Sequence, residues 1–314
     1  MTTARVLVGD CLESMRTLPD GVARCCVTSP PYFGLRDYGV DGQIGLEATP
    51  DAYIERLVAV FREVQRVLAD DGTLWLNLGD SYATVGGSHA GRDDQRGVGA
   101  RRVLSAGAGD SGNRSAPPGL KAKDLIGIPW RVALALQADG WYLRSDIIWH
   151  KPNPMPESVK DRPTKAHEYL FLLAKSERYY YDAEAIAEEA VCDRKRGPAL
   201  HPDVVSTNGN SGLGRREPQP TRNARTVWTI PTRPFKGAHF AVFPEALAER
   251  CILAGSAPGD TILDPFGGSG TVGVVATKRG RSAILCELNP EYAAMAEGRI
   301  AQTQPGLGLE VARA

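Results

Sequence analysis

The stretch Val27-Thr28-Ser29-Pro30-Pro31-Tyr32-Phe33 follows a short apolar run, and the rest of the chain is organised around it. Its two prolines fix the backbone angle φ and remove two N–H donors, and the first proline pushes Ser29 toward an extended conformation. We therefore expect a rigid strand end that presents a hydroxyl, carbonyl oxygens and an aromatic ring. Such a surface suits a planar ring that carries an amino group. The alternative is a simple proline turn after a core strand.

The overall composition is typical of a soluble globular protein. The chain has 314 residues, of which 42% are hydrophobic and 24% charged. Its 37 basic and 37 acidic residues give no net charge, which argues against a protein that coats nucleic acid non-specifically. No apolar run approaches the length of a membrane span, and residues 1–8 lack the pattern of a signal peptide. We therefore expect a cytoplasmic protein without a membrane partner.

The cysteines give no indication of a metal site. No two of them form a C-x-x-C pair, and none follows a proline. Most lie in apolar segments, which is typical of buried thiols in a reducing compartment. The six residues are Cys11, Cys25, Cys26, Cys192, Cys251 and Cys286.

Hydrophobic periodicity predicts an alternation of strands and helices. We expect strands at residues 5–8, 23–27, 73–78, 141–149, 261–263 and 282–286. We expect helices at residues 11–18, 51–68, 124–138 with Asp124 as cap, 183–190, 244–253, 271–279 and from Asn289 onward. Two further strands, at residues 169–173 and 179–181, are expected to form an antiparallel hairpin.

Two segments lack this periodicity. Residues 86–119 are rich in Gly, Ser, Arg and Asp, and are expected to be a flexible loop. That loop is either a solvated surface loop or an arm that orders on a polyanion. Residues 183–234 are polar and basic, which indicates an inserted module that contacts phosphates, or else a merely solvated segment. The basic residues expected to contact the phosphates of a nucleic acid are Arg194, Lys195, Arg196, Arg215, Arg216, Arg222 and Arg225.

A second motif, Asp264-Pro265-Phe266-Gly267-Gly268-Ser269-Gly270-Thr271, follows the strand expected at residues 261–263. A strand, glycine-rich turn, helix and strand ending in an acidic residue form an arrangement typical of nucleotide binding. That acidic residue is Glu287, which can hold ribose hydroxyls. Asp264 before the turn favours a ligand with an ammonium group rather than a pyrophosphate. The motif therefore indicates a ligand that is part amino acid and part nucleoside, as S-adenosylmethionine is.

Together the two motifs resemble those of the beta class of DNA amino-methyltransferases. In that class the (D/N/S)-P-P-(Y/F) motif comes first, a target-recognition region follows, and the glycine-rich cofactor motif lies near the C-terminus. The resemblance covers nearly the whole chain. It implies an α/β Rossmann-like methyltransferase fold with circularly permuted motif order and a mostly parallel seven-stranded sheet that includes one antiparallel hairpin strand. The expected units are a catalytic half at 1–182, a target-recognition region at 183–234 and a cofactor-binding half at 235–314.

The resemblance also implies roles for individual residues. The catalytic residues would be Ser29, Pro30, Pro31 and Tyr32, which hold and stack on a base flipped out of double-stranded DNA. The residues expected to bind S-adenosylmethionine, and its product S-adenosylhomocysteine, are Asp10, Cys11, His239, Phe240, Pro244, Asp264, Pro265, Phe266, Gly267, Gly268, Ser269, Gly270, Thr271, Glu287 and Leu288. Capping of the helix that begins at Cys11 is the alternative role for Asp10.

Ser29 at the first motif position, preceded by Thr28, resembles the cytosine-N4 subgroup. We therefore expect a bacterial or phage enzyme, near the nucleoid, that methylates the N4 amine of cytosine. A homodimer and a cognate restriction endonuclease are expected as possible partners. The alternatives are an adenine-N6 enzyme, a protein glutamine methyltransferase, in which the glycine motif comes first, and a non-catalytic DNA-binding relative.

Overall fold

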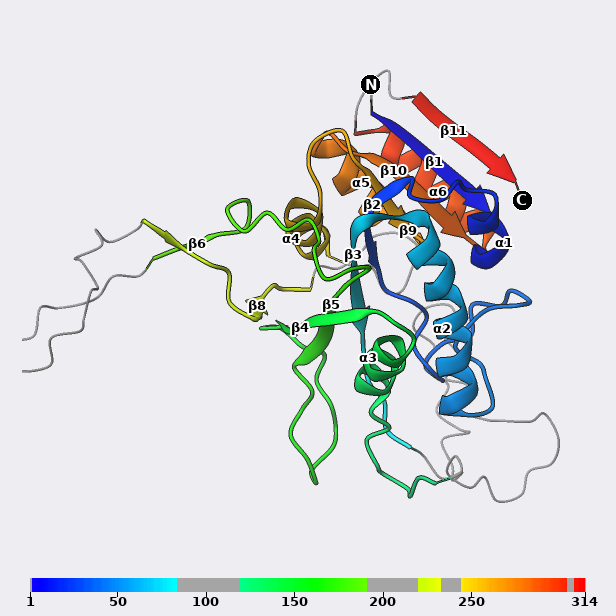
Figure 1. Cartoon of the computed structure of the whole chain (residues 1–314). Helices are drawn as coiled ribbons and strands as arrows, with labels where there is room; N and C mark the ends of the chain where they lie inside the picture. Colours follow the sequence, from blue (N-terminus) through cyan, green and yellow to red (C-terminus); the bar gives the residue numbers. More distant parts are fainter. Residues whose placement is uncertain (1, 84–118, 191–219, 233–243, 304–307, 314) are drawn as a thin grey trace, which may run out of the picture.

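A nine-stranded sheet forms the centre of the computed structural model, which describes residues 2–83, 119–190, 220–232, 244–303 and 308–313 (Figure 1). The strand order is β11-β1-β10-β9-β2-β3-β5-β4-β8, and β5 alone runs antiparallel to its neighbours. Seven of these strands make the sheet expected from the sequence, and β11 and β8 extend its two edges. The strands are β1 (Thr3–Val8), β2 (Ala23–Thr28), β3 (Leu68–Leu78), β4 (Tyr142–His150), β5 (His167–Ala174), β8 (Val227–Thr229), β9 (Thr261–Asp264), β10 (Ser282–Glu287) and β11 (Gly308–Arg313).

Helices cover both faces of the sheet. One hydrophobic cluster joins the sheet to α1 (Cys11–Arg16), α2 (Pro50–Val67) and α3 (Ile128–Ala138). A second cluster joins the opposite face to α4 (Glu245–Gly255), α5 (Thr271–Lys278) and α6 (Pro290–Ala301). Covering helices on both faces explain why the central strands β2, β9 and β10 are almost continuously buried rather than alternating.

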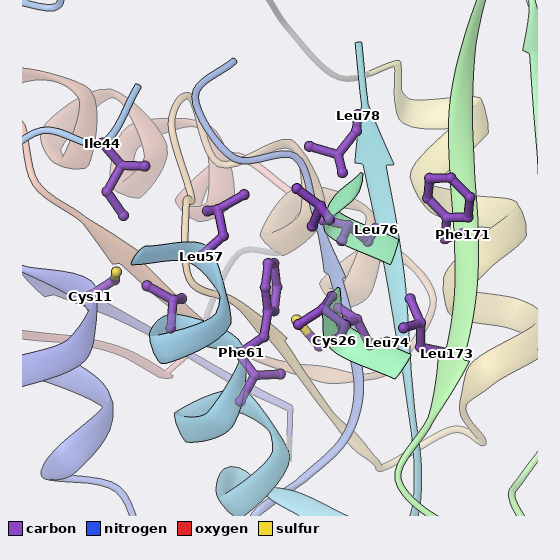
Figure 2. Packing of buried hydrophobic residues seen from close by; sticks show 14 of the residues in the cluster. Cys11, Cys26, Ile44, Leu57, Phe61, Leu74, Leu76, Leu78, Phe171 and Leu173 are labelled. Carbon is purple, nitrogen blue, oxygen red and sulfur yellow. The ribbon is translucent and has the colours of Figure 1, made fainter. Parts of the chain in front are cut away.

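Side chains along the strands alternate between these two clusters. Leu74 and Leu76 belong to the cluster under α2, whereas Trp75 between them belongs to the cluster under α4. Figure 2 shows Phe61 of α2 lying against Cys26 and Leu74. All of these side chains are at most 1% exposed. Burial of each large apolar side chain stabilises the fold by about 1.5–3 kcal/mol.

The topology brings the two sequence motifs together. β2 pairs with β9 in parallel, so the carboxyl ends of both strands lie at the same edge of the sheet. The Ser-Pro-Pro-Tyr motif follows β2, and the glycine-rich motif begins at the end of β9. β1 pairs with β10 and β11, so strands from the two ends of the chain lie side by side in one sheet. The expected N-terminal and C-terminal halves therefore form a single sheet.

The hairpin predicted at residues 169–181 is wrong. The antiparallel strand is β5, whose partners are β3 and β4, and residues 179–181 form no strand. The aromatic residues that suggested a strand pack on the face of the sheet instead. Tyr181 stacks on Trp75 with ring centroids 6.4 Å apart, and Tyr179 packs against the same cluster.

Two predicted helix features are also wrong. Residues 183–190 are not helical, because Glu188 lies in β6 (Glu188–Glu189), which pairs with β7 (Thr221–Arg222). Asp124 does not cap α3, which begins at Ile128. The carboxylate of Asp80 accepts hydrogen bonds from the N–H groups of Gly127 and Ile128 and so performs that function from a distant strand end.

The segment expected to recognise the target is described only in part. Its last portion contains β8, which pairs with β4 and belongs to the main sheet. The small β6–β7 sheet is its other described element. The loop predicted at residues 86–119 lies outside the described residues except for Gly119.

Candidate active site

A cavity of about 1000 Å³ opens at the carboxyl edge of the sheet, where β2, β9 and β10 end. Residues of both sequence motifs line it, although they are more than 230 positions apart. The predicted site residues that line the cavity are Asp10, Cys11, Ser29, Pro30, Pro31, Tyr32, Asp264, Pro265, Phe266, Gly267, Gly268, Ser269, Thr271, Glu287 and Leu288.

The hydroxyl groups of Ser29 and Tyr32 converge on one buried amide. The Oδ1 atom of Asn77 accepts hydrogen bonds from Ser29 Oγ at 3.3 Å and from Tyr32 Oη at 3.1 Å. Its Nδ2 atom donates to the carbonyl oxygen of Tyr169 at 3.0 Å, which fixes the orientation of the amide. Asn77 is 1% exposed and lies on β3 beside β2. This buried asparagine was missed from the sequence, although a polar residue within the apolar strand Thr73–Leu78 is a usable signal.

An ion pair lies on the other side of Tyr32. The Oε2 atom of Glu168 lies 2.8 Å from Tyr32 Oη and is a second acceptor for the same hydroxyl proton, and its Oε1 atom pairs with Lys151. The side chains of Lys151 and Glu168 are only 18% and 15% exposed. Lys151 also lies over the ring of Trp149, with Nζ 4.3 Å from the centroid. These residues were not predicted, because charged residues beside strand ends are common and their meeting depends on the β4–β5 pairing.

Burial and the charge of Glu168 raise the pKa of Tyr32 well above its ordinary value. The phenol is therefore neutral at any physiological pH. Its ring lies directly against the backbone of Gly79, where an added Cβ would be 2.4 Å from the ring atom Cε2. The ring of Tyr32 fits here because Gly79 has no side chain.

One buried and one half-buried carboxyl group, those of Asp264 and Glu287, line the part of the cavity formed by the C-terminal motif. Asp264 is 4% exposed, and its Oδ1 atom accepts from Thr28 Oγ1 at 2.7 Å and from the Phe266 N–H at 3.1 Å. Burial raises the pKa of Asp264 to about 7. Burial also raises the pKa of Glu287, whose carboxylate oxygens accept from the N–H groups of Gly268 and Asn289 at 2.7 and 2.9 Å.

The glycine-rich turn is held tightly between β9 and α6. Gly270 has φ of +77° and caps α5. A Cβ at this position would lie 2.7 Å from the Cβ of Ala296, so the turn depends on glycine for both conformation and space. Gly270 itself does not line the cavity, whereas its neighbours Gly267, Gly268 and Ser269 do.

Asp10 has the capping role that the sequence left open. Its Oδ1 atom accepts hydrogen bonds from the N–H groups of Leu12 and Glu13 at 2.8 and 3.2 Å, while the residue also lines the cavity. Burial, and then the charge of Asp10, raises the pKa of the Cys11 thiol to about 12. Cys286, also on the cavity wall, has a pKa raised well above its ordinary value by burial. The described cavity therefore offers no reactive thiolate.

The remaining predicted site residues lie elsewhere. Pro244 is the N-terminal cap of α4 and does not line the cavity. Of the predicted DNA-binding residues, Arg222 and Arg225 lie beside Glu188, at 3.5 and 2.9 Å from Oε2. Burial opposes ionisation of Glu188, but its hydrogen bonds to Arg225 and Arg250 lower its pKa to about 2. The predicted site residues that fall outside the described part of the chain are His239, Phe240, Arg194, Lys195, Arg196, Arg215 and Arg216.

Two aromatic residues that the sequence did not indicate also line the cavity. Tyr38 and Tyr292 meet edge to face, with ring centroids 6.5 Å apart, beside Glu287. No cluster of residues suited to holding a metal ion occurs in the described part of the chain. Likewise, none of the helices described has the length and hydropathy that a membrane-spanning segment needs.

This fold and cavity define a Rossmann-like methyltransferase. Residues 23–298 match the DNA methylase family N6_N4_Mtase, and the chain belongs to this family. It is 51% identical over 297 residues to the type II methyltransferase M.Cfr9I of Citrobacter freundii, covering 95% of this chain and 87% of the relative. It is 49% identical over 300 residues to the type II methyltransferase M.SmaI of Serratia marcescens, covering 96% of this chain and 91% of the relative.

Solved structures agree with this assignment. TTHA0409 from Thermus thermophilus, in complex with S-adenosyl-L-methionine, matches with a TM-score of 0.62 and 25% identity over 99% of both chains. The cytosine-N4-specific PvuII DNA methyltransferase has a TM-score of 0.63 at 19% identity, covering 98% of this chain and 96% of its own, and this likeness supports the fold alone. The chain is thus a DNA methyltransferase of the N4/N6 family, and its methyl donor is S-adenosylmethionine. The carboxyl groups of Asp264 and Glu287 beside the glycine turn fit the ammonium and ribose groups of this donor.

Replacement of Gly79 by alanine tests the packing of the tyrosine ring. Because the new Cβ would overlap Tyr32, we expect Gly79→Ala to displace the ring and lower the rate of methyl transfer to DNA at least about tenfold, a cost of about 1.4 kcal/mol. Gly298→Ala is the matched control, since no atom lies within 4 Å of its Cβ position. Equal methylation rates for the two variants would contradict this account.

Proposed function

We propose that the protein methylates the exocyclic N4 amine of cytosine in double-stranded DNA. The observation that carries this proposal is the arrangement around Ser29, which lines the cavity and whose hydroxyl donates to Asn77. The oxygen lone pairs are then available to accept a hydrogen bond from an amine. The Pro30 carbonyl supplies a second acceptor, because Pro30 lines the same cavity.

Two hydrogen-bond acceptors of the protein, facing the two N–H groups of the amine, would make its nitrogen more nucleophilic. The lone pair of an exocyclic amine is delocalised into the ring, and hydrogen bonds from both N–H groups favour a more tetrahedral nitrogen. S-adenosylmethionine supplies an electrophilic methyl group on its sulfonium. Ser29 and Pro30 then fix the nitrogen for in-line attack, and such positioning supplies much of the acceleration. A base inside a duplex is out of reach, so it must be flipped and can stack on Tyr32.

The proton that the methylated nitrogen loses has a defined path. The Ser29 hydroxyl first turns from Asn77 Oδ1 to Tyr32 Oη, 3.4 Å away, while Tyr32 donates to Glu168 Oε2 at 2.8 Å. The amine proton then passes to Ser29 Oγ as the serine proton moves to Tyr32 and the tyrosine proton moves to Glu168. Because the pKa of Tyr32 is raised, its phenol stays neutral. It can therefore pass a proton on, but it cannot serve as the final base. Glu168, with Lys151 as its counter-ion, is therefore the proposed final acceptor.

Asp264 and Glu287 are the proposed ligands of the donor. An ionised Asp264 can pair with the ammonium group of the methionine portion, and Glu287 can accept hydrogen bonds from ribose hydroxyls. The backbone of Gly267 and Gly268 lets the ligand approach closely, with Phe266, Tyr38 and Tyr292 offering aromatic surface. Asp10, Cys11 and Leu288 complete this proposed pocket.

Cytosine is favoured over adenine by the serine at the first motif position. A serine at this position resembles the cytosine-N4 subgroup, whereas aspartate or asparagine is more usual among adenine-N6 enzymes. The family includes both activities by name, so adenine-N6 methylation is the second candidate. Double-stranded DNA is the proposed substrate, with residues 183–234 as its recognition region. The similarity to type II methyltransferases supports a cognate restriction endonuclease as a partner, and the homodimer stays a prediction.

The product identifies the target base. Plasmid DNA incubated with labelled donor is expected to yield N4-methylcytidine by nucleoside mass spectrometry. Ser29→Ala is expected to lower the yield at least about hundredfold, because one acceptor on the amine is lost. Detection of N6-methyladenosine would show that the target base is adenine and not cytosine. If neither base were methylated, the proposed function would be contradicted.

The proton relay predicts that Tyr32→Phe and Glu168→Gln lower kcat by similar amounts, about hundredfold each. Phenylalanine keeps the ring for stacking, and glutamine keeps the shape of Glu168. Because the two residues act in one chain, the double variant is expected to be no slower than either single variant. Tyr142→Phe, at a tyrosine that is 45% exposed, is the control. An unchanged kcat in Tyr32→Phe would exclude the relay and leave the stacking role intact.

The raised pKa of Asp264 predicts that donor binding depends on pH. The ionised carboxylate binds the ammonium group, so affinity is expected to fall about tenfold per pH unit below about pH 7. Calorimetric titration with S-adenosylmethionine between about pH 5.5 and about pH 7.5 measures this effect while the ammonium group stays protonated. Asp264→Asn is expected to bind weakly with no such slope. A wild-type affinity that is constant over this range would contradict the assigned contact.

A further inference from the structure

The loop at residues 151–166 joins β4 to β5 and projects beyond the ends of both strands (Figure 1). It leaves the sheet at the edge that carries the catalytic motif. Its first residues line the active-site cavity, including Lys151, Asn153, Pro154 and Met155. This loop took no part in the proposed chemistry apart from Lys151.

Met155 is the most exposed large apolar residue in the described part of the chain, at 86%. An exposed apolar side chain is not unusual alone, but this one stands on the wall of the cavity that holds Tyr32. Prolines at positions 154 and 156 flank it, which restricts the backbone on both sides. Met155 is thus held outward by a stiff segment and packs little against the rest of the protein.

Contacts to neighbouring elements hold the loop in place. The side chain of Asn153 exchanges two hydrogen bonds with the backbone of Thr232, at 2.9 and 3.0 Å. The guanidinium of Arg162 lies 4.0 Å from the ring centroid of Tyr82, and Lys165 Nζ donates to the Asp80 carbonyl at 2.9 Å. The side chain of Met155 therefore projects from a fixed base.

The charges of the loop suit a nucleic acid. Its sequence contains four basic residues and two acidic ones, Glu157 and Asp161. The acidic residues are paired, Glu157 with Arg162 at 2.6 Å and Asp161 with Lys123 at 2.6 Å, and Lys151 is paired with Glu168. Lys160 and Lys165 therefore carry the net positive charge of the loop. Lys160 is exposed near the loop tip. An apolar tip on a basic loop matches a duplex, which has charged backbones around an apolar stack of bases.

We propose that Met155 is a wedge that enters the base stack of DNA and fills the space left by the flipped target base. The proposal rests on the proposed function, since it requires a base to leave the duplex for the cavity. Flipping breaks stacking on both sides of the target, and inserted apolar side chains lower the cost of that disruption. Methionine is unbranched and flexible, so it can fit an irregular gap.

Comparison of two duplexes tests this role. The first carries the site that wild-type protein methylates, as mapped on plasmid DNA. The second is identical but has an abasic position opposite the target cytosine, which removes base pairing and makes flipping easier. On the first duplex, Met155→Ala is expected to lower kcat/KM at least about tenfold, the equivalent of about 1.4 kcal/mol. On the second, the variant is expected to come within about twofold of wild type.

Two further variants sharpen the result. Val159→Ala, at an apolar residue of the same loop that is 38% exposed, is the matched control and is expected to behave as wild type on both duplexes. Met155→Leu keeps an apolar side chain of similar size and is expected to retain most activity on the paired duplex.

The alternatives give different outcomes. Equal losses on both duplexes would overturn the wedge and indicate that Met155 contacts the flipped base or the methyl donor. No loss on the paired duplex would overturn it as well. If wild-type protein methylated neither duplex nor plasmid DNA, the proposed function itself would fail, so the two failures are distinguishable.

Discussion

The parallel pairing of β2 with β9 is the constraint on which the site depends. It places the ends of two strands side by side, one leading into Ser29-Pro30-Pro31-Tyr32 and the other ending at Asp264. The hydrogen bond from Thr28 to Asp264, at 2.7 Å, joins them across 236 positions of sequence. Loops that follow adjacent parallel strands open onto a common crevice, which is where ligands bind in open α/β sheets.

Around that pairing, buried polar groups set the chemistry of each part of the cavity. Asn77 and Glu168 surround the hydroxyl groups of the catalytic motif with acceptors, so that both hydroxyls are oriented before any substrate arrives. Asp264 is buried and Glu287 is half-buried, and each has partners for only some of its lone pairs. A buried carboxyl group in this state favours a ligand that can complete its hydrogen bonds or neutralise its charge.

Strands β4 and β5 and the loop between them form the wall of the site beside Tyr32. β5 and β4 bring Glu168 and Lys151 to Tyr32, and the loop between these strands carries Met155 to the cavity mouth. The same hairpin thus links the proposed proton acceptor to the proposed contact with DNA. By contrast, Arg222 and Arg225 are paired with Glu188, which ties this part of the proposed recognition region to α4 through Arg250.

By itself the sequence determined the alternation of strands and helices, the two motifs and the nature of the donor, because periodicity, proline and glycine act locally. The Ser29 motif and the Asp264 turn were both found where the cavity lies. Only the tertiary structure decided that Asn77, Glu168 and Lys151 meet Tyr32, and that Asp80 rather than Asp124 caps α3. It also moved the antiparallel hairpin from residues 169–181 to β4 and β5. Such contacts depend on pairing between strands that are distant in the sequence, and no local sequence pattern specifies that pairing.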